Sequence, residues 1–302
     1  MRPPPAVLPF SRALVVANPI AGRGRARRAA DELARGLGQR GLEVELFFTG
    51  ARGDARERAL RLPREVDLVV CAGGDGTLGE VLAGLAGDPP RTVPVALLPV
   101  GTANVMSLDL GLPRTVAGAI EMIAGGRTTA LDTARVNGER LSFLVTGIGF
   151  DAMAVHDLES RRSGPIRRTA YVASGLRALA RYVPPSLEVE IDGAKVPGRF
   201  AQVLASNVVH YAGLRVLSAD RRLDDGLFEV YLFPNGSRLG LAGYGFRALL
   251  LGLPGGSCVR LRGRRVCVHS DVPVPCQVDG DAYGRTPVEI AVHPVQSRLL
   301  VP

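Results

Sequence analysis

The sequence predicts an α/β protein in two parts: a doubly wound, mostly parallel sheet, followed by a β-rich, sandwich-like domain. Strand and helix patterns alternate along the first 130 residues, which is typical of a parallel sheet with helices on both faces. From about Leu131, short alternating strand patterns replace them, separated by turn signals such as Asn137-Gly138. A length of 302 residues is also enough for two domains. We therefore expect domains at 1–130 and 131–292, with residues 293–302 packing back onto the first.

In the first domain, each expected strand is a short run rich in Val, Leu or Ala, and each expected helix shows spaced apolar positions. The helix after the third strand is the clearest, because Leu78, Val81, Leu82 and Leu85 fall on one face. The expected strands are 13–17, 43–49, 66–72 and 93–98, and the expected helices are 23–38, 53–62, 77–86 and 116–125.

In the second domain, most of the apolar runs are too short for helices and alternate as half-buried strands do. Two longer helical patterns, 169–181 and 238–251, interrupt them. The expected strands are 134–136, 143–147, 187–191, 200–207, 228–233, 258–261, 265–269, 276–278 and 288–292.

The composition favours an anionic partner. The net charge is +8 and the pI about 9.9, which suits a nucleotide, a membrane surface or a nucleic acid. Nucleic acid is not expected, because the chain has no series of aromatic residues for stacking bases. Only Lys195 of the 37 basic residues is a lysine, so a general arginine bias also explains the charge.

The sequence lacks the patterns of a transmembrane protein and of a zinc-binding protein. No apolar stretch reaches the ~18 residues that a transmembrane helix needs. The four cysteines form no CxxC pair, so we expect free thiols and no zinc site. We expect a cytoplasmic protein.

A glycine turn follows the buried strand pattern 66–72 and opens the next helix. Its glycines let backbone N–H groups approach an anion, and the helix N-terminus adds partial positive charge, so the turn predicts phosphate binding. Asp75 is unusual there, because a carboxylate repels phosphate unless it is hydrogen-bonded, or a metal ion or catalysis requires it. The alternative is a tight turn with Asp75 as the helix cap. The turn is Gly73-Gly74-Asp75-Gly76-Thr77.

Polar or glycine-bearing loops follow all four expected strands of the first domain. Because ligands bind beyond the carboxyl ends of the strands in such sheets, we expect the four loops to converge on one crevice. The loops are 18–22, 49–50, 73–77 and 99–104.

Together these residues resemble the bacterial diacylglycerol kinase-like lipid kinases, which are related to sphingosine kinases. That family shares a nucleotide-binding fold with NAD kinases and 6-phosphofructokinases. The resemblance runs nearly end to end. It is carried by Asn18-Pro19 with Gly22, the glycine turn with Glu80, Pro99 with Gly101-Thr102-Ala103-Asn104, Gly147-Ile148-Gly149-Phe150-Asp151, Leu223-Asp224-Asp225-Gly226-Leu227 and Val278-Asp279-Gly280-Asp281.

The resemblance implies an enzyme that transfers the γ-phosphate of ATP to a lipid hydroxyl and uses Mg²⁺. Asp281 matches the general base, and Asp75 matches a catalytic position near the ATP-bound metal. The first domain is then the nucleotide-binding domain and the second the acceptor and metal-binding domain. The matched ATP-binding positions are Asn18, Thr49, Gly73, Gly74, Asp75, Gly76, Thr77, Glu80, Gly101, Thr102 and Asn104.

The resemblance also implies a structural Mg²⁺ held by Asp225 and the carbonyls of Arg222 and Leu227, since hard oxygen ligands suit this ion. Asp132 matches an acidic position that links this metal site to the crevice. The implied partners are a lipid alcohol, such as diacylglycerol or a sphingoid base, and an anionic membrane contacted peripherally through the basic residues 160–168. A homodimer is possible on the same basis.

Three positions depart from the family pattern. Most relatives have Asn where this chain has Gly79, many have Asp where it has Val105, and the base is often Glu where it has Asp281. These departures leave open a non-catalytic nucleotide- or lipid-binding homologue. An NAD kinase-like activity also stays open, because the glycine turn alone does not separate the two families.

Overall fold

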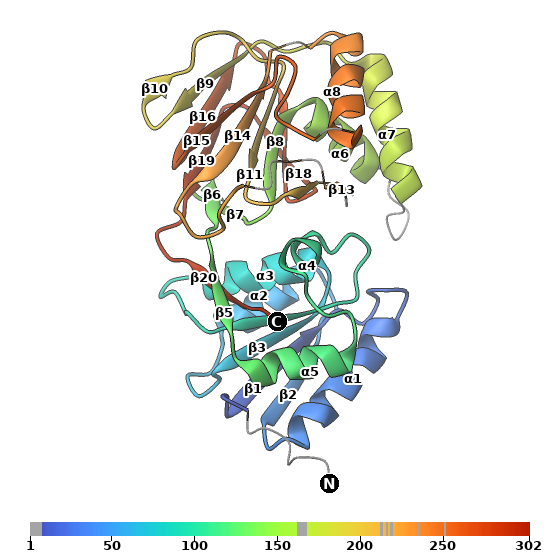
Figure 1. Ribbon diagram of the computed structural model, residues 1–302, viewed down its shortest axis with the longest axis vertical. Helices are drawn as coiled ribbons and strands as arrows, with labels where there is room; N and C mark the ends of the chain where they lie inside the picture. Colours follow the sequence, from blue (N-terminus) through green and yellow to red (C-terminus); the bar gives the residue numbers. More distant parts are fainter. Residues whose placement is uncertain are drawn as a thin grey trace. The chain divides into compact units, whose positions relative to one another are not determined.

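The computed structural model describes residues 8–161, 168–211, 214–215, 217, 220–234, 236–250 and 252–302. The chain forms two compact units (Figure 1). The first unit is Met1–Leu131 with Val295–Pro302, and the second is Asp132–Pro294. The α/β fold class predicted from the sequence is confirmed, with a largely parallel sheet in the first unit and a β-rich second unit.

A six-stranded sheet in the order β2-β1-β3-β4-β20-β5 forms the centre of the first unit. The first four strands pair in parallel, as the alternation of strands and helices predicts. The two middle strands, β3 and β4, are buried along their whole length, as expected for the centre of a parallel sheet. The strands are β1 (Arg12–Ala17), β2 (Glu43–Phe48), β3 (Leu68–Gly73), β4 (Val95–Pro99), β5 (Thr128–Leu131) and β20 (Ser297–Leu300).

Two pairs of helices pack with this sheet. Helix α1 (Arg25–Gly38) contacts α5 (Val116–Gly125), and α2 (Asp54–Leu60) contacts α3 (Asp75–Leu85). Both contacts are close: a Cβ on Gly36 would lie 2.4 Å from Ile120 Cδ1, and one on Gly84 would lie 2.3 Å from a backbone oxygen of α2. Glycine is therefore required where the paired helices touch. A short helix that the sequence analysis did not predict, α4 (Val105–Leu110), follows β4.

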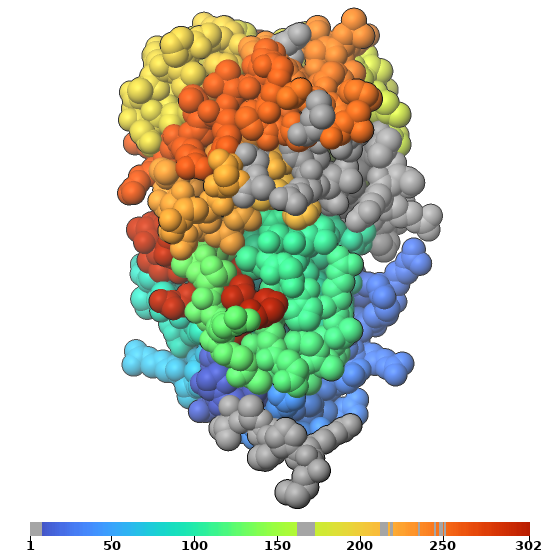
Figure 2. All heavy atoms as spheres, in the orientation of Figure 1, coloured from blue at the N-terminus to red at the C-terminus, as the bar shows by residue number. Residues whose placement is uncertain are grey.

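Strand β20 comes from the far end of the chain and completes the sheet of the first unit. It lies between β4, to which it runs parallel, and β5, to which it runs antiparallel. In Figure 2 its red residues lie among the green residues around β5. Leu299 and Leu300 are buried there, so these two side chains belong to the core of the first unit.

The second unit is a sandwich of two antiparallel six-stranded sheets. One sheet has the order β10-β9-β16-β19-β6-β7 and the other β15-β14-β11-β8-β17-β18. The first consists of β10 (Ala194–Lys195), β9 (Leu187–Ile191), β16 (Arg265–Ser270), β19 (Val288–Val292), β6 (Ala134–Val136) and β7 (Arg140–Ser142). The second consists of β15 (Val259–Gly263), β14 (Phe228–Phe233), β11 (Gln202–Ser206), β8 (Val145–Gly149), β17 (Pro275–Val278) and β18 (Asp281–Arg285). A small ribbon, β12 (His210–Tyr211) and β13 (Leu214–Arg215), lies apart from both.

Both faces of the second sheet are buried. On β11, Val203 and Ala205 point into the sandwich core, whereas Leu204 joins a separate cluster with Leu241 and Tyr244 of α8. Successive side chains of a strand point to opposite faces, so this alternation explains why β11 is apolar nearly throughout. The helices of this unit are α6 (Phe150–Ser160), α7 (Arg168–Arg181) and α8 (Arg238–Leu250). None of the described helices is long and apolar enough to cross a membrane.

The sequence analysis missed several elements of the second unit. Helix α6 begins directly after the glycines of residues 147–149, where a sequence motif rather than a helical pattern was recognised. Its buried residues, Ala152, Val155 and Leu158, do lie three apart. Strand β18 is polar and half-exposed, so it lacks the alternation that identifies a strand. The four cysteines are free, as expected.

Candidate functional site

Three loops of the first unit meet at the carboxyl ends of β1, β3 and β4. The backbone N–H of Asn18 donates to Ala72 O (3.3 Å), and that of Val100 donates to Gly73 O (2.9 Å). A Cβ on Gly22 would lie 2.4 Å from Val100 O, so the first loop also touches the third. The predicted convergence of these loops is therefore present within this unit.

The glycine turn and the 99–104 loop touch backbone to backbone. A Cβ on Gly101 would lie 2.6 Å from both Gly74 Cα and Asn104 Oδ1, and one on Gly73 would lie 2.7 Å from Thr77 Oγ1. No side chain fits between the two loops at this point, and the N–H of Gly101 donates to Gly73 O (3.3 Å), which joins them. Such close approach of main chain is what phosphate binding requires.

Asn104 closes the 99–104 loop in a left-handed conformation, with φ of +49°. Its Nδ2 donates to Gly101 O (2.9 Å), which tightens the loop. Its Oδ1 is buried and has no hydrogen-bond partner among the described residues. The loop therefore holds an acceptor that the described part of the protein does not use.

Asp75 binds the start of α4 instead of its own helix. Its carboxylate accepts hydrogen bonds from the backbone N–H groups of Val105 (2.9 Å) and Met106 (3.2 Å). The cap position of α3 is occupied by Gly74, which makes no side-chain cap. The idea that Asp75 caps the helix it opens is therefore wrong, and its carboxylate joins the glycine turn to the segment after β4. Burial raises its pKa, and hydrogen bonds from the backbone N–H groups of Val105, Met106 and Asp75 itself oppose that rise.

Glu80 acts in a similar way on α2. Its two oxygens accept from the backbone N–H groups of Gly53 (2.9 Å) and Ala55 (3.2 Å), which start that helix. Thr49 lies just before this segment, with its N–H donating to Ala17 O (2.9 Å). Glu80 therefore positions the second loop, and its contact with ATP stays a prediction. Thr102 and Gly76 are exposed at the edge of the loops, where a ligand can reach them.

Asp132 anchors the metal-binding turn expected in the second unit. Its N–H donates to Leu223 O (2.6 Å), and its Oδ2 accepts from the N–H of Gly226 (2.6 Å). The Asp132 side chain is almost fully buried, so this anchor is fixed. Within the turn, Asp225 Oδ1 accepts from the N–H of Leu227 (3.1 Å).

The oxygen atoms around this turn suit Mg²⁺ chemically. Among the described residues, no three His, Cys, Asp or Glu side chains gather closely enough to hold a metal. A site built from Asp225 and backbone carbonyls needs no such cluster. Next to Asp132, the buried Asn207 Oδ1 and Thr133 Oγ1 lack a partner among the described residues, so further oxygen atoms are available.

Asp281 stands at the start of β18 and forms an ion pair with Arg140 Nη2 (2.8 Å). Its side chain stays 36% exposed, so a substrate can reach it. Two residues earlier, Asp279 adopts φ of +53° and binds the chain segment before β8. It accepts from the backbone N–H groups of residues 143–145 at 2.9–3.0 Å and from Ser142 Oγ at 3.1 Å.

Asp151 and Gln277 hold the turn that leads to Asp281. Gln277 Nε2 donates to Asp151 Oδ2, and Gln277 Oε1 accepts from the N–H of Gly280, both at 2.8 Å. Burial raises the pKa of Asp151 to about 6, and the hydrogen bond from Gln277 opposes the rise. Sequence reasoning quoted Asp151 only as part of a motif and missed Gln277 and Arg140, because no local pattern pairs residues more than 120 positions apart.

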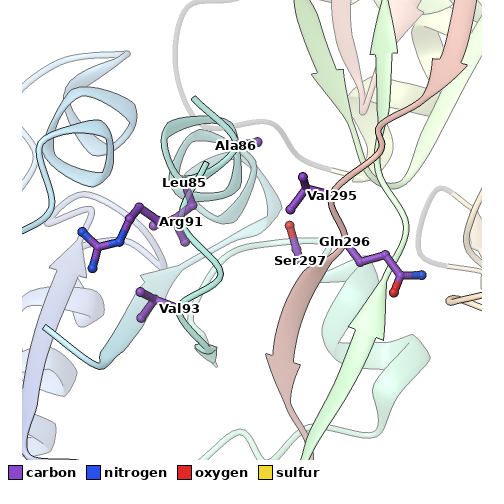
Figure 3. Close-up of a pocket in the computed structure, with 7 residues that line it drawn as sticks. All are labelled: Leu85, Ala86, Arg91, Val93, Val295, Gln296 and Ser297. Atoms are coloured by element: carbon purple, nitrogen blue, oxygen red, sulfur yellow. The ribbon is translucent and has the colours of Figure 1, made fainter. Parts of the chain in front are cut away.

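A small hollow in the first unit lies away from these loops (Figure 3). It is bounded by the end of α3 and by residues just before β4 and β20, at the amino ends of these two parallel strands. Arg91 turns its guanidinium away from the hollow, toward Leu62 O (3.0 Å). The space has room for about one water molecule, so it is no nucleotide site. Its lining residues are Leu85, Ala86, Arg91, Val93, Val295, Gln296 and Ser297.

Most of the basic segment 160–168 lies outside the described residues, including Arg162 and Arg167, and so does the side chain of Arg168. Arg161 is described, and its Nε donates to Asp157 Oδ1 (3.1 Å). One of the four arginines expected to face a membrane is therefore engaged in an ion pair.

Two family models match most of the chain. The model of the diacylglycerol kinase catalytic domain matches residues 12–136. A model described as the YegS C-terminal NAD kinase beta sandwich-like domain matches residues 145–301. The two matches together span both units.

Individual relatives point the same way. A diacylglycerol kinase of Bacillus subtilis is 28% identical over 287 residues, covering 93% of each chain. One of Staphylococcus epidermidis is 31% identical over 222 residues, covering 73% of this chain and 70% of its own. A crystal structure of a diacylglycerol kinase from Bacillus anthracis superposes with a TM-score of 0.76 at 19% identity, covering 97% of this chain and 98% of its own. A second crystal structure from that organism reaches 0.80 at 21% identity, with 97% of both chains covered. These structures establish the likeness of fold.

Proposed function

Because this chain belongs to the diacylglycerol kinase family and is thus a lipid kinase, we propose that it transfers the γ-phosphate of ATP to the hydroxyl of a lipid alcohol. Diacylglycerol or a sphingoid base is the acceptor class. The observation that carries the proposal is the meeting of the glycine turn with the 99–104 loop, where no side chain fits between the two backbones. This cradle lies within the part that matches the kinase catalytic domain.

The first unit holds ATP. Backbone N–H groups of the glycine turn and of Thr102 bind its phosphates, and the N-terminus of α3 contributes partial positive charge. The N–H of Gly101, which donates to Gly73 O (3.3 Å), keeps the two loops together. Asp75 keeps the two loops together through the start of α4, and Glu80 keeps the loop after β2 in place. These contacts position the γ-phosphate, and positioning is a large part of catalysis in phosphoryl transfer.

The second unit supplies the base. Asp281 accepts the proton of the lipid hydroxyl while the oxygen forms a bond to the γ-phosphorus and the bond from that phosphorus to ADP breaks. Arg140 orients the Asp281 carboxylate through their ion pair. Asp225, with the carbonyls of Arg222 and Leu227, would hold a structural Mg²⁺, which would keep the turn in place. When bound with ATP, a second Mg²⁺ neutralises charge on the phosphate oxygens.

A membrane contact follows from this substrate class. Long-chain lipid alcohols reside in the bilayer, so the protein binds the membrane peripherally to reach them. The net charge of +8 favours a surface that carries anionic lipids.

The proposal is tested with ATP labelled at the γ-phosphate, Mg²⁺ and a panel of lipid alcohols in mixed micelles. We expect the wild-type protein to label one lipid class, and Asp281→Asn to lower that rate by at least about 10²-fold, because the amide cannot accept the proton. Asp281→Glu, which restores the side chain common in the family, retains activity.

Asp271→Asn is the matched control, because Asp271 is an exposed carboxylate of the same unit outside the proposed site. It should leave the rate unchanged. Label on NAD instead of a lipid contradicts the proposal, and so does ATP binding without any transfer. Full activity in Asp281→Asn contradicts the role of the base.

A further inference from the structure

One side of helix α8 exposes apolar side chains where a surface helix normally carries polar ones. Leu239, Phe246 and Leu250 are 87%, 68% and 65% exposed, and their spacing of seven and four residues places them on one face. Ala242 and Gly243, which are also exposed, fill the positions between them. The opposite side of α8 is buried in the cluster that contains Leu241 and Tyr244.

Helix α7, which packs against α8, shows the same feature (Figure 1). Leu176 is 64% exposed, Ala180 is exposed, and Val183, just after the helix, is 80% exposed. The three positions again recur at helical spacing. The exposed residues of both helices are thus largely apolar, and exposed apolar surface of this kind marks an interaction site.

The charge around the α7–α8 pair selects the partner. Helix α7 contains three arginines and α8 contains two, and neither helix contains Asp or Glu; of these arginines, Arg177 pairs with Asp157 of α6 (2.9 Å). Arg181 and Arg238 are exposed, with no ion-pair partner among the described residues. A partner that complements this face must therefore offer both an apolar and an anionic surface. A lipid bilayer offers both at the boundary between its acyl chains and its anionic headgroups.

The same charge argues against a second copy of the chain. A symmetric dimer built on this surface would bring identical patches together. Arg181 and Arg238, which lack an ion-pair partner among the described residues, would then meet like charges and be repelled.

We propose that the α7–α8 pair is the surface that docks on an anionic bilayer, with Leu239 and Phe246 entering the acyl boundary. Arg181 and Arg238 bind lipid phosphates at the headgroup level. The two helices have 14 and 13 residues, so they lie in the interface and do not cross it. The proposal rests on the proposed lipid kinase function, because it identifies how the enzyme reaches a membrane-borne acceptor.

The test measures sedimentation of the full chain with vesicles of phosphatidylcholine containing phosphatidylglycerol, without ATP. We expect Leu239→Gln with Phe246→Gln to weaken binding at least about tenfold, because apolar burial is lost. Arg181→Gln with Arg238→Gln should weaken it about fivefold per arginine at low salt. Val272→Thr, at a 60% exposed apolar position of the same unit outside both helices, is the control and should bind as the wild type does.

Unchanged vesicle binding in both double variants would overturn the proposal. So would concentration-dependent dimers that Phe246→Gln abolishes, measured by light scattering without lipid, because a second copy would then cover this face.

Kinase assays with a water-soluble short-chain diacylglycerol distinguish failure of the docking proposal from failure of the proposed kinase function. The double variants should phosphorylate the soluble acceptor at the wild-type rate and lose activity only on vesicles. No transfer to the soluble acceptor in any form of the protein would instead contradict the kinase proposal and leave the vesicle result to be judged on its own.

Discussion

At the scale of single residues, carboxylates of the candidate site bind backbone N–H groups of neighbouring segments. Asp75 binds the start of α4 and Glu80 the start of α2, where unpaired N–H groups and the helix dipole favour negative charge. In the second unit, Asp279 and Asp151 hold the turn before Asp281. Asp281, the proposed base, therefore follows a turn that Asp151 and Asp279 hold in place through hydrogen bonds.

Asp151 predicts a dependence of stability on pH. Its pKa is about 6 in the folded protein against 3.8 for a free side chain, so the folded state binds more protons between these values. The protonated Asp151 carboxyl therefore stabilises the folded protein at low pH, and this stabilisation is lost as pH rises through about 6. Relative to Asp151→Asn, which does not titrate, the wild-type free energy of unfolding should fall by roughly 2–3 kcal/mol between pH 4 and 7.

Urea titrations of both proteins across this pH range measure the difference, with Asp271→Asn as a variant of an exposed carboxylate. A difference between wild type and Asp151→Asn that stays constant with pH would show that the Asp151 carboxyl has an ordinary pKa.

At the scale of elements, the close contacts between helices depend on glycine. A Cβ on Gly84 of α3 would lie 2.3 Å from Arg56 O and 2.7 Å from Ala59 Cβ, both on α2. Gly84→Ala should therefore destabilise the protein by about 1–3 kcal/mol, although alanine favours helices. Gly38→Ala, at a helix end where nothing lies within 4 Å, should be neutral or slightly stabilising. Urea unfolding of the two variants provides the comparison, and equal stability would contradict the packing argument.

Sequence patterns predicted the elements with strong apolar periodicity. Strands β6, β9, β14 and β19 and helix α5 have the predicted bounds. Strand β5 and strand β18 were missed, because they are partly exposed and their burial does not alternate.

In the candidate site, too, only features carried by a local sequence pattern could be predicted. The glycine turn is local and was recognised, whereas the contacts of Arg140 and Gln277 depend on residues more than 120 positions away.

At the scale of the whole molecule, the first unit depends on a distant segment. Strand β20 fills the space between β4 and β5, and Leu299 and Leu300 contribute to the core there. Ending the chain after Pro294 should expose the edges of β4 and β5 and remove amide protection in the first unit, while β8 and β11 stay protected.

Hydrogen exchange by mass spectrometry distinguishes the two units in this experiment. Removal of the exposed Pro302 alone is the control and should leave every strand protected. Retained protection of β4 in the shorter chain would show that β20 is dispensable.

The position of β20 also determines the order in which the two units complete their folding during synthesis. Residues up to 131 leave the ribosome first, yet their sheet stays incomplete until residue 300 has emerged. By then the entire second unit has been made and has had time to fold. Although domains generally fold in the order of synthesis, the sheet of the first unit is finished last. Under the proposed function, a nascent chain would therefore complete its phosphate-binding unit only after its acceptor unit has been made.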